Sequence, residues 1–494
     1  PLVVNYRCFV ADSTSNRGNA LRLLGNTDEA LAAYRKSAAL YDPLIRDQPT
    51  MTRYRTNQGI VLGNIGYLLE EAERIDEALA AYEKSRAVRE SLVALNPNVP
   101  RFQADLALSH FCVAKCQTKV GVAHHASQAA AALACCRSPL PMLPSLFPPR
   151  EEVDGHYSPE AEENYSKALA IQTRLVSDFP NLPDLRADLG RTYVQLGNIC
   201  RDKKDLVQAF DQYRKAIDLL KALVAERPKV VEYRNNLAIA DYNYGLTMQD
   251  LRLALLALNA HEEGRVLREA LIAEKPDDKD YPRDLASTYN GLGLANLSLR
   301  RYEKALEWFD KAVAAWGPVI RREPDKARHR SNRARGVLNR GITLAEMGKH
   351  WEAIAEYTRA VGMHREAVDR APGHFKYREL LGKTYQKMAQ SYRAVGRPDL
   401  AAAAVRDWRA LWTTQAAPLV DVAIELAQCA TAVGKPGKPL TDAQADLRRR
   451  CADEAVEVLR QALALGYPDR DRLARENNFD PLRDREDFRK LVAP

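Results

Sequence analysis

The sequence is poor in several features that mark specialised classes of protein. Only 8 of its 494 residues are cysteine, at irregular spacings, so we expect reduced thiols and a cytoplasmic protein instead of a disulfide framework. No apolar run approaches the roughly 18–20 residues that cross a bilayer, so we expect a soluble chain without a membrane partner. Glycine (24) and proline (26) are close to average usage, which argues against a collagen-like or largely disordered chain.

Sequence motifs for catalysis are also missing. The segment Gly434–Lys438 has prolines where a phosphate loop needs converging backbone N–H groups, and Gly291-Leu292-Gly293 lies in a predicted helix, not after a strand. Neither a Gly-x-Ser-x-Gly elbow nor the paired motifs of protein kinases occur. We therefore predict that this chain is no enzyme, uses no cofactor and takes no small-molecule substrate.

Prolines recur along the chain at a fixed interval. Each step is 48 residues except that from Pro97 to Pro180, which is 83, or 48 plus 35. We predict eight repeats of 48 residues over 1–419 with a 35-residue insertion at about 121–155. Residues 420–494 are predicted to form a degenerate ninth helix pair, with its second helix over Cys451–Leu465, and a C-terminal cap. The recurring prolines are Pro1, Pro49, Pro97, Pro180, Pro228, Pro276, Pro324 and Pro372.

Small and aromatic residues recur within each repeat at helical spacing. A glycine or alanine is followed by an alanine and, four residues later, usually by an aromatic residue, as in Gly66, Ala78 and Tyr82. Small residues let two helix axes approach, and the aromatic ring fills the neighbouring groove. Each repeat is therefore predicted to be helix A, a short turn and helix B. The aromatic positions are Tyr34, Tyr82, Tyr165, Tyr213, Phe309 and Tyr357, with His261 and Val405 as exceptions.

This pattern resembles the signature of the tetratricopeptide repeat family, as in Gly341, Ala353, Tyr357 and Ala360. The usual repeat has about 34 residues, so each repeat here has about four additional helical turns. We place two of them at the start of helix A and two at the end of helix B. The resemblance implies an all-α, right-handed solenoid of antiparallel helix pairs, a superhelix in which helix A lines the concave wall.

The insertion differs in composition from the repeats. Five prolines between Pro139 and Pro149 exclude a continuous helix, so we expect a loop in the A-to-B turn of the third repeat. Nearby histidines and cysteines raise the alternative of a zinc site, but the short ligand spacings of zinc motifs are absent, and we predict no metal. The candidate ligands are His110, Cys112, Cys116, His124, His125, Cys135, Cys136 and His156.

Helix A carries the residues that we expect to bind a partner. In similar solenoids, asparagines three residues before the packing glycine hydrogen-bond the backbone of a bound peptide, because one amide both donates and accepts. The alternative is that asparagine is merely tolerated there. Cys112, Gly291 and Lys387 depart from the pattern, which puts a continuous ladder of amides in doubt. The predicted groove residues are Asn16, Asn64, Gln195, Asn243, Asn339 and Lys387.

A basic stretch stands out in the seventh repeat. At helical spacing its five arginines spread over more than one face, so they form a patch and not a stripe. An acidic or phosphorylated peptide is one possible ligand, and a plain solvated surface is the alternative. The predicted basic patch comprises Arg328, Arg330, Arg333, Arg335 and Arg340.

These features predict a scaffold for protein–protein interaction that binds a segment of a partner protein in its concave groove. The repeats, with segments such as Asp76–Tyr82, also resemble the C-terminal arrays of bacterial serine/threonine protein kinases, as does the closing segment Asn478–Arg483. That resemblance implies a substrate-recruiting or regulatory region, and we expect Pro1 to be a fragment boundary. An RNA-binding repeat is a third alternative, which the net charge of +8 permits but which the lack of interleaved aromatic residues disfavours.

Overall fold

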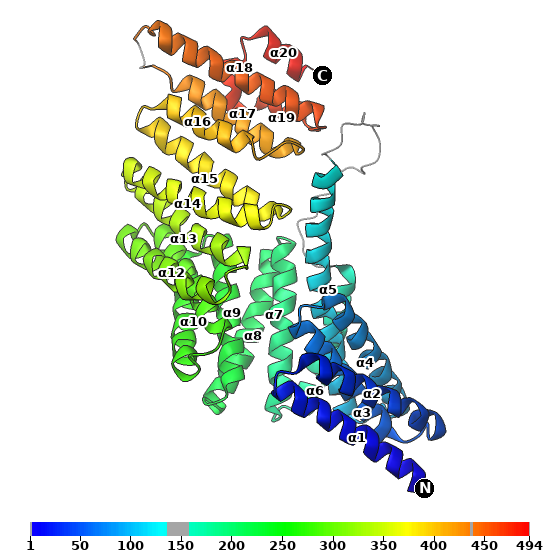
Figure 1. Cartoon of the computed structure of the whole chain (residues 1–494). Coiled ribbons are helices and arrows are strands. Elements are labelled where there is room, and N and C mark those ends of the chain that lie inside the picture. The colour runs from blue at the N-terminus through cyan, green and yellow to red at the C-terminus, as the bar shows by residue number, and fades with distance from the viewer. Residues whose placement is uncertain (1, 136–157, 435–437, 494) are drawn as a thin grey trace. The chain divides into compact units, whose positions relative to one another are not determined.

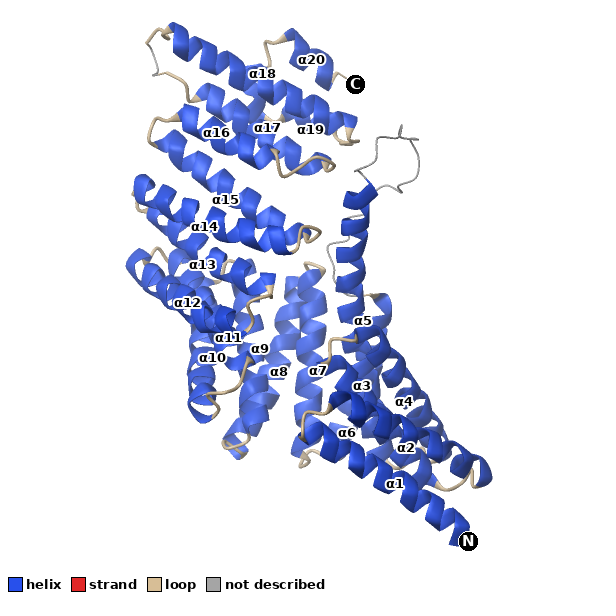
Figure 2. Ribbon diagram, viewed as in Figure 1, coloured by secondary structure: helices blue, strands red, loops and turns tan. Residues whose placement is uncertain are grey.

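The protein is built from stacked helices. The computed structural model describes residues 2–135, 158–434 and 438–493, and every regular element in these ranges is helical (Figures 1 and 2). Consecutive helices are joined by short turns and pack side by side as antiparallel pairs. The predicted all-α solenoid class is therefore confirmed.

The chain divides into two compact units, residues Pro1–Leu267 and Arg268–Pro494, with the boundary inside α10. The helices that begin in the first unit are α1 (Leu2–Leu23), α2 (Thr27–Asp47), α3 (Thr52–Glu71), α4 (Ile75–Leu95), α5 (Pro100–Cys135), α6 (Pro159–Asp178), α7 (Pro183–Asp202), α8 (Leu206–Glu226), α9 (Val231–Asp250) and α10 (Ala254–Glu274). The second unit continues with α11 (Asp280–Ser298), α12 (Tyr302–Arg322), α13 (Ala327–Glu346), α14 (His350–Arg370), α15 (Phe375–Ala394), α16 (Pro398–Arg409), α17 (Ala416–Thr431), α18 (Asp442–Ala464), α19 (Arg470–Arg475), the 3₁₀ helix η1 (Asn477–Leu482) and α20 (Glu486–Val492).

Each pair is held together by a small residue on its first helix and a ring on its second. A Cβ atom added to Gly66 on α3 would lie 2.7 Å from the ring of Tyr82 on α4, so only glycine allows this approach. The same contact joins Gly341 on α13 to Tyr357 on α14. His261 replaces the tyrosine on α10, and its fully buried ring packs on Gly245. The spacing of small and aromatic residues in the sequence therefore reports directly on helix packing.

The turns that join the two helices of a pair share one backbone conformation. In seven such turns of the described chain, one residue lies in the left-handed region, with φ of 56° to 64° where it is not glycine. These residues are Gly25, Glu73, Lys204, Arg252, Arg300, Gly348 and Gly396. The left-handed residue ends the first helix and reverses the chain, so the pair becomes antiparallel.

The turns between pairs are closed by an arginine near the start of the next helix. Arg378 on α15 donates a hydrogen bond to the carbonyl oxygen of Pro372 at 2.6 Å, and Arg55 on α3 bonds the carbonyl of Pro49 in the same way. This contact accounts for the arginine six residues after the repeat proline at Arg55, Arg330 and Arg378.

The expectation of a loop over 121–155 is wrong for its first part, because α5 continues to Cys135. The segment from Ala126 to Cys135 is rich in alanine, the strongest helix former, and the prolines begin only at Pro139. The remaining residues of the insertion, 136–155, lie outside the described ranges.

The C-terminal cap is built from three short elements that follow α18. Phe479 of η1 and Phe488 of α20 are buried and pack on each other with ring centroids 5.7 Å apart. The helix predicted from Cys451 begins earlier, at Asp442, because Thr441 and Gln444 form a capping box. In the described part of the chain, no helix combines the length and the apolar character that crossing a bilayer requires.

Candidate functional site

The residues predicted to face the groove all lie on first helices of pairs. Asn16 on α1 is exposed, Gly291 on α11 is buried, and the others are half-buried. In the first unit the half-buried ones are Asn64 on α3, Cys112 on α5, Gln195 on α7 and Asn243 on α9; in the second they are Asn339 on α13 and Lys387 on α15.

Several of these side chains bond to the protein itself. Asn339 donates a hydrogen bond from Nδ2 to Oδ1 of Asn290 on α11 at 3.0 Å. Gln195 accepts a bond from Asn198 at 3.3 Å, and Lys387 donates to Gln390 at 3.1 Å. The amides of Gln195 and Asn339 are thus partly occupied, and the ladder of free amides stays a prediction for Asn16, Asn64 and Asn243.

The arginines of the basic patch differ in what they contact. Arg330 forms an ion pair with Glu366 on α14 at 3.4 Å, and Arg340 pairs with Asp310 on α12. Arg333 is half-buried, and its Nε has no hydrogen-bond partner among the described residues. Arg328 and Arg335 are exposed and line a groove together with Asn339. Two of the five arginines therefore line one groove with Asn339.

This groove, which we call the α13–α15 groove, has a volume of about 460 Å³. It lies on the second unit and is lined by side chains from α11, α13, the turn before α15, and α15. The lining residues are Leu294, Arg328, Ser331, Asn332, Arg335, Leu338, Asn339, His374, Lys376, Tyr377, Glu379, Leu380 and Lys383.

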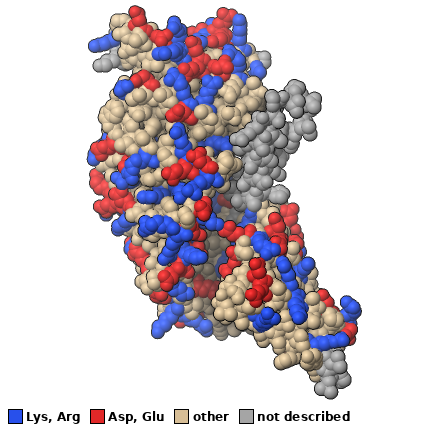
Figure 3. Space-filling model, in the orientation of Figure 1, with Lys and Arg blue, Asp and Glu red and all other residues tan. Residues whose placement is uncertain are grey.

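Positive charge is concentrated in the α13–α15 groove. Burial lowers the pKa of Lys383, and the neighbouring charges of Lys387, Arg335 and Lys376 lower it further, while Glu379 opposes them. Lys376 pairs with Glu379 at 2.9 Å. Figure 3 shows Lys and Arg interspersed with Asp and Glu over one face of the molecule.

The floor of the groove combines an aromatic stack with an unsatisfied hydroxyl. The rings of His374 and Tyr377 stack with centroids 4.0 Å apart, and burial raises the pKa of Tyr377. Ser331 is 1% exposed, and its Oγ has no hydrogen-bond partner within the described ranges.

Lys376 and Lys383 were missed by the sequence analysis, although a signal for them exists. They follow Arg328 and Arg335 by 48 residues each, so the same two positions are cationic in two successive pairs. In the preceding pair these positions are Asp280 and Ser287. Comparing equivalent positions, instead of reading one stretch, would have found the site.

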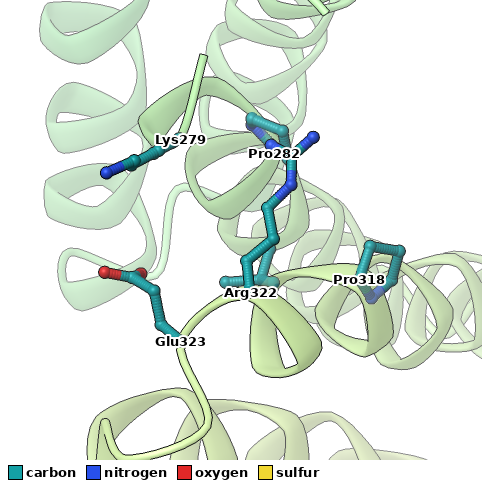
Figure 4. A pocket seen from close by; sticks show the side chains of 6 residues that line it. Lys279, Pro282, Pro318, Arg322 and Glu323 are labelled. Carbon is teal, nitrogen blue, oxygen red and sulfur yellow. The ribbon is translucent and has the colours of Figure 1, made fainter. Parts of the chain in front are cut away.

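A second cavity in the same unit is much smaller. Figure 4 shows it between the start of α11 and the end of α12, where Pro282, Pro318 and Arg322 surround a space of about 80 Å³. That volume admits only a few water molecules, so we assign it no ligand.

The zinc alternative finds no support among the described residues, where no group of three histidine, cysteine or acidic side chains could hold a metal ion. Burial raises the pKa of Cys112 to about 11 and that of Cys116 to about 12, which keeps both thiols protonated. His110 instead shares a hydrogen bond of 2.8 Å with Asn164. The side chains of His124, His125, Cys135, Cys136 and His156 lie outside the described part.

Comparisons with known proteins agree with the helical-repeat architecture. Three segments match models of the tetratricopeptide repeat, which supports the presence of such repeats in this chain. The matched segments are residues 10–41, 190–219 and 253–320. No curated protein matches the sequence.

Solved structures with related shapes are distant in sequence. The apo form of RapI is 11% identical, covers 88% of this chain and 96% of its own, and has a TM-score of 0.49. A tetratricopeptide repeat protein from Parabacteroides merdae is 14% identical, covers 76% of this chain and 98% of its own, and has a TM-score of 0.35. BtubC from P. vanneervenii is 16% identical, with coverages of 56% and 94% and a TM-score of 0.38. None of these likenesses bears on what this chain binds.

Proposed function

We propose that the chain is a protein-interaction scaffold that holds a segment of a partner protein in the α13–α15 groove. The observation that carries this proposal is the groove itself, which is large enough for several side chains. Its wall combines half-buried polar side chains, such as Asn332 and Asn339, with an apolar one, Leu380. A partner segment gains both apolar burial and hydrogen bonds there.

The proposal is tested by filling the groove. Asn332 lines the groove and is half-buried, so Asn332→Trp places a bulky side chain inside it. Gly362→Trp on α14 is the matched control, because an added Cβ there meets nothing within 4 Å. Proteins captured from the source cells by the immobilised chain are identified by mass spectrometry. The proposal predicts a partner that N332W loses and G362W keeps, whereas equal capture by both variants would refute it.

Two more specific roles are secondary proposals. One is that the chain is the regulatory or substrate-recruiting array of a serine/threonine protein kinase, which rests on sequence resemblance alone. A kinase assay with the complete gene product tests it by measuring whether the captured partner is phosphorylated. An RNA-binding role predicts a steep loss of affinity for single-stranded RNA with rising salt.

A further inference from the structure

We propose that the α13–α15 groove selects an extended segment rich in aspartate and glutamate. This inference rests on the proposed function and adds the chemistry of the partner. It follows from the arrangement of the cations, from the lack of an ion-pair partner for three of the four in the described part of the chain, and from the poor fit of the other anionic ligands.

The cations form two rows on neighbouring first helices. Arg328 and Arg335 on α13 are seven residues apart, as are Lys376 and Lys383 on α15, and all four line the groove. Seven residues are close to two helical turns, so both members of a row lie on one face of their helix, about 10 Å apart along its axis. An extended chain of the polyproline II type has three residues per turn and rises about 3.1 Å per residue, so residues three apart share one face and are about 9 Å apart. Acidic residues at every third position therefore match the rows.

Three of these four cations are not neutralised within the described part of the chain. Arg328, Arg335 and Lys383 form no ion pair there, and Glu379, the acidic residue of the groove lining, is already paired with Lys376 at 2.9 Å. Three neighbouring positive charges lower the pKa of the partly buried Lys383, beyond the effect of its burial. Carboxylates placed between the rows relieve this repulsion, which favours an acidic segment over a neutral one.

The geometry disfavours the other anionic ligands. A single phosphate is best held by arginine and lysine groups that converge on one point, whereas these cations are spread along two helices. Single-stranded RNA needs aromatic faces for its bases. Tyr377 of the groove lining is 8% exposed, and its ring is already stacked on that of His374.

The test measures binding of fluorescent peptides to the full chain by anisotropy. The probe is a peptide with glutamate at every third position between serine and alanine, and its reference has glutamine in place of each glutamate. The groove variant is Arg335→Glu with Lys383→Glu. The control variant, Arg301→Glu with Lys304→Glu, makes the same change of net charge at exposed sites near the start of α12. A neutral variant, Arg335→Gln with Lys383→Gln, separates loss of charge from reversal, and circular dichroism checks that all variants fold.

We expect the glutamate peptide to bind the unmodified chain and the control variant equally, and the glutamine peptide to bind neither. The groove variant should lose about tenfold or more in affinity, and the neutral variant should fall between. Equal loss in the control variant, equal binding of both peptides, tighter binding of a single-stranded RNA probe, or no binding of the glutamate peptide would each overturn the acidic assignment. The proposed function is decided separately, by the partner that N332W loses and G362W keeps.

Discussion

Asn339 on α13 donates a hydrogen bond of 3.0 Å to Asn290 on α11, so two asparagines link neighbouring pairs on the wall that was expected to bind a peptide. Asn339, which the sequence predicted to face a peptide-binding groove, lines the α13–α15 groove. Its amide, however, also has a structural partner. A ligand that uses Asn339 must share the amide with Asn290 or compete for it.

The Asn339–Asn290 bond predicts coupled effects on stability. Asn339→Ala and Asn290→Ala should each lower the free energy of unfolding by about 0.5–1.5 kcal/mol, and the double variant should lose less than the sum. Urea unfolding of the four proteins completes the cycle. Additive losses would show that the two side chains do not interact in solution.

The glycine contact on α13 predicts opposite effects for the same substitution at two sites. In Gly341→Ala the added Cβ would lie 2.5 Å from the ring of Tyr357, so we expect a loss of about 1–3 kcal/mol. In Gly362→Ala on α14 the Cβ meets nothing within 4 Å, so the better helix propensity of alanine should stabilise by about 0.5–1 kcal/mol. Thermal or urea unfolding measures both. Equal effects would contradict the packing described for Gly341.

The left-handed turns predict that replacing Arg300 by glycine stabilises the protein. Arg300, between α11 and α12, has φ of 56°, which costs free energy for a residue with a side chain. Arg300→Gly should therefore raise the free energy of unfolding by about 0.5–1 kcal/mol. Gly348, with φ of 78° in the next pair, is the control, and Gly348→Ala should destabilise by a similar amount. A destabilised R300G protein would contradict the strained turn.

The buried His364 on α14 predicts a pH dependence of stability. Burial, with the nearby charge of Arg335 as a smaller cause, lowers its pKa from 6.5 to about 4. The unfolded chain therefore takes up a proton between these values while the folded chain does not. The stability that depends on the neutral ring is complete above pH 6.5 and is lost as the pH falls towards 4, by up to about 3 kcal/mol.

The control for this prediction comes from the repeat itself. Leu220 on α8 precedes His364 by three repeats of 48 residues, so leucine is tolerated at this position in another pair. His364→Leu should weaken the pH dependence between pH 4 and 6.5 relative to the unmodified chain. An identical slope in both proteins would show that His364 is protonated in the folded state.

The fold could be predicted largely from the sequence because its signals are local and repeated. Gly66 and Tyr82 are 16 residues apart, as are Gly341 and Tyr357, and this spacing brings the glycine and the ring together across a pair of antiparallel helices. The extension of α5 to Cys135 was missed because the later prolines were weighed above the alanine-rich segment before them. The helix start at Asp442 was missed because its capping box lies outside the apolar pattern on which the prediction relied.

The candidate site was only partly predictable. Arg328, Arg335 and Asn339 were named, but sequence spacing alone could not tell that Arg330 and Arg340 bond to neighbouring second helices. Lys376 and Lys383 of the next pair could have been found by comparing positions 48 residues apart, unlike the ion pairs of Arg330 and Arg340. Such contacts depend on which face of each helix meets its neighbour, and that is set by packing across pairs.

The most direct test of the account is photo-crosslinking from inside the α13–α15 groove. A photoreactive amino acid is placed at Asn332 in the full chain, or at Gly362 on α14 as the control, and the crosslinked peptide is sequenced by mass spectrometry. The account predicts one acidic segment of a partner protein crosslinked from position 332 and absent from position 362. The same peptides from both positions, or none from 332 while a partner remains bound, would place the binding surface elsewhere and contradict it.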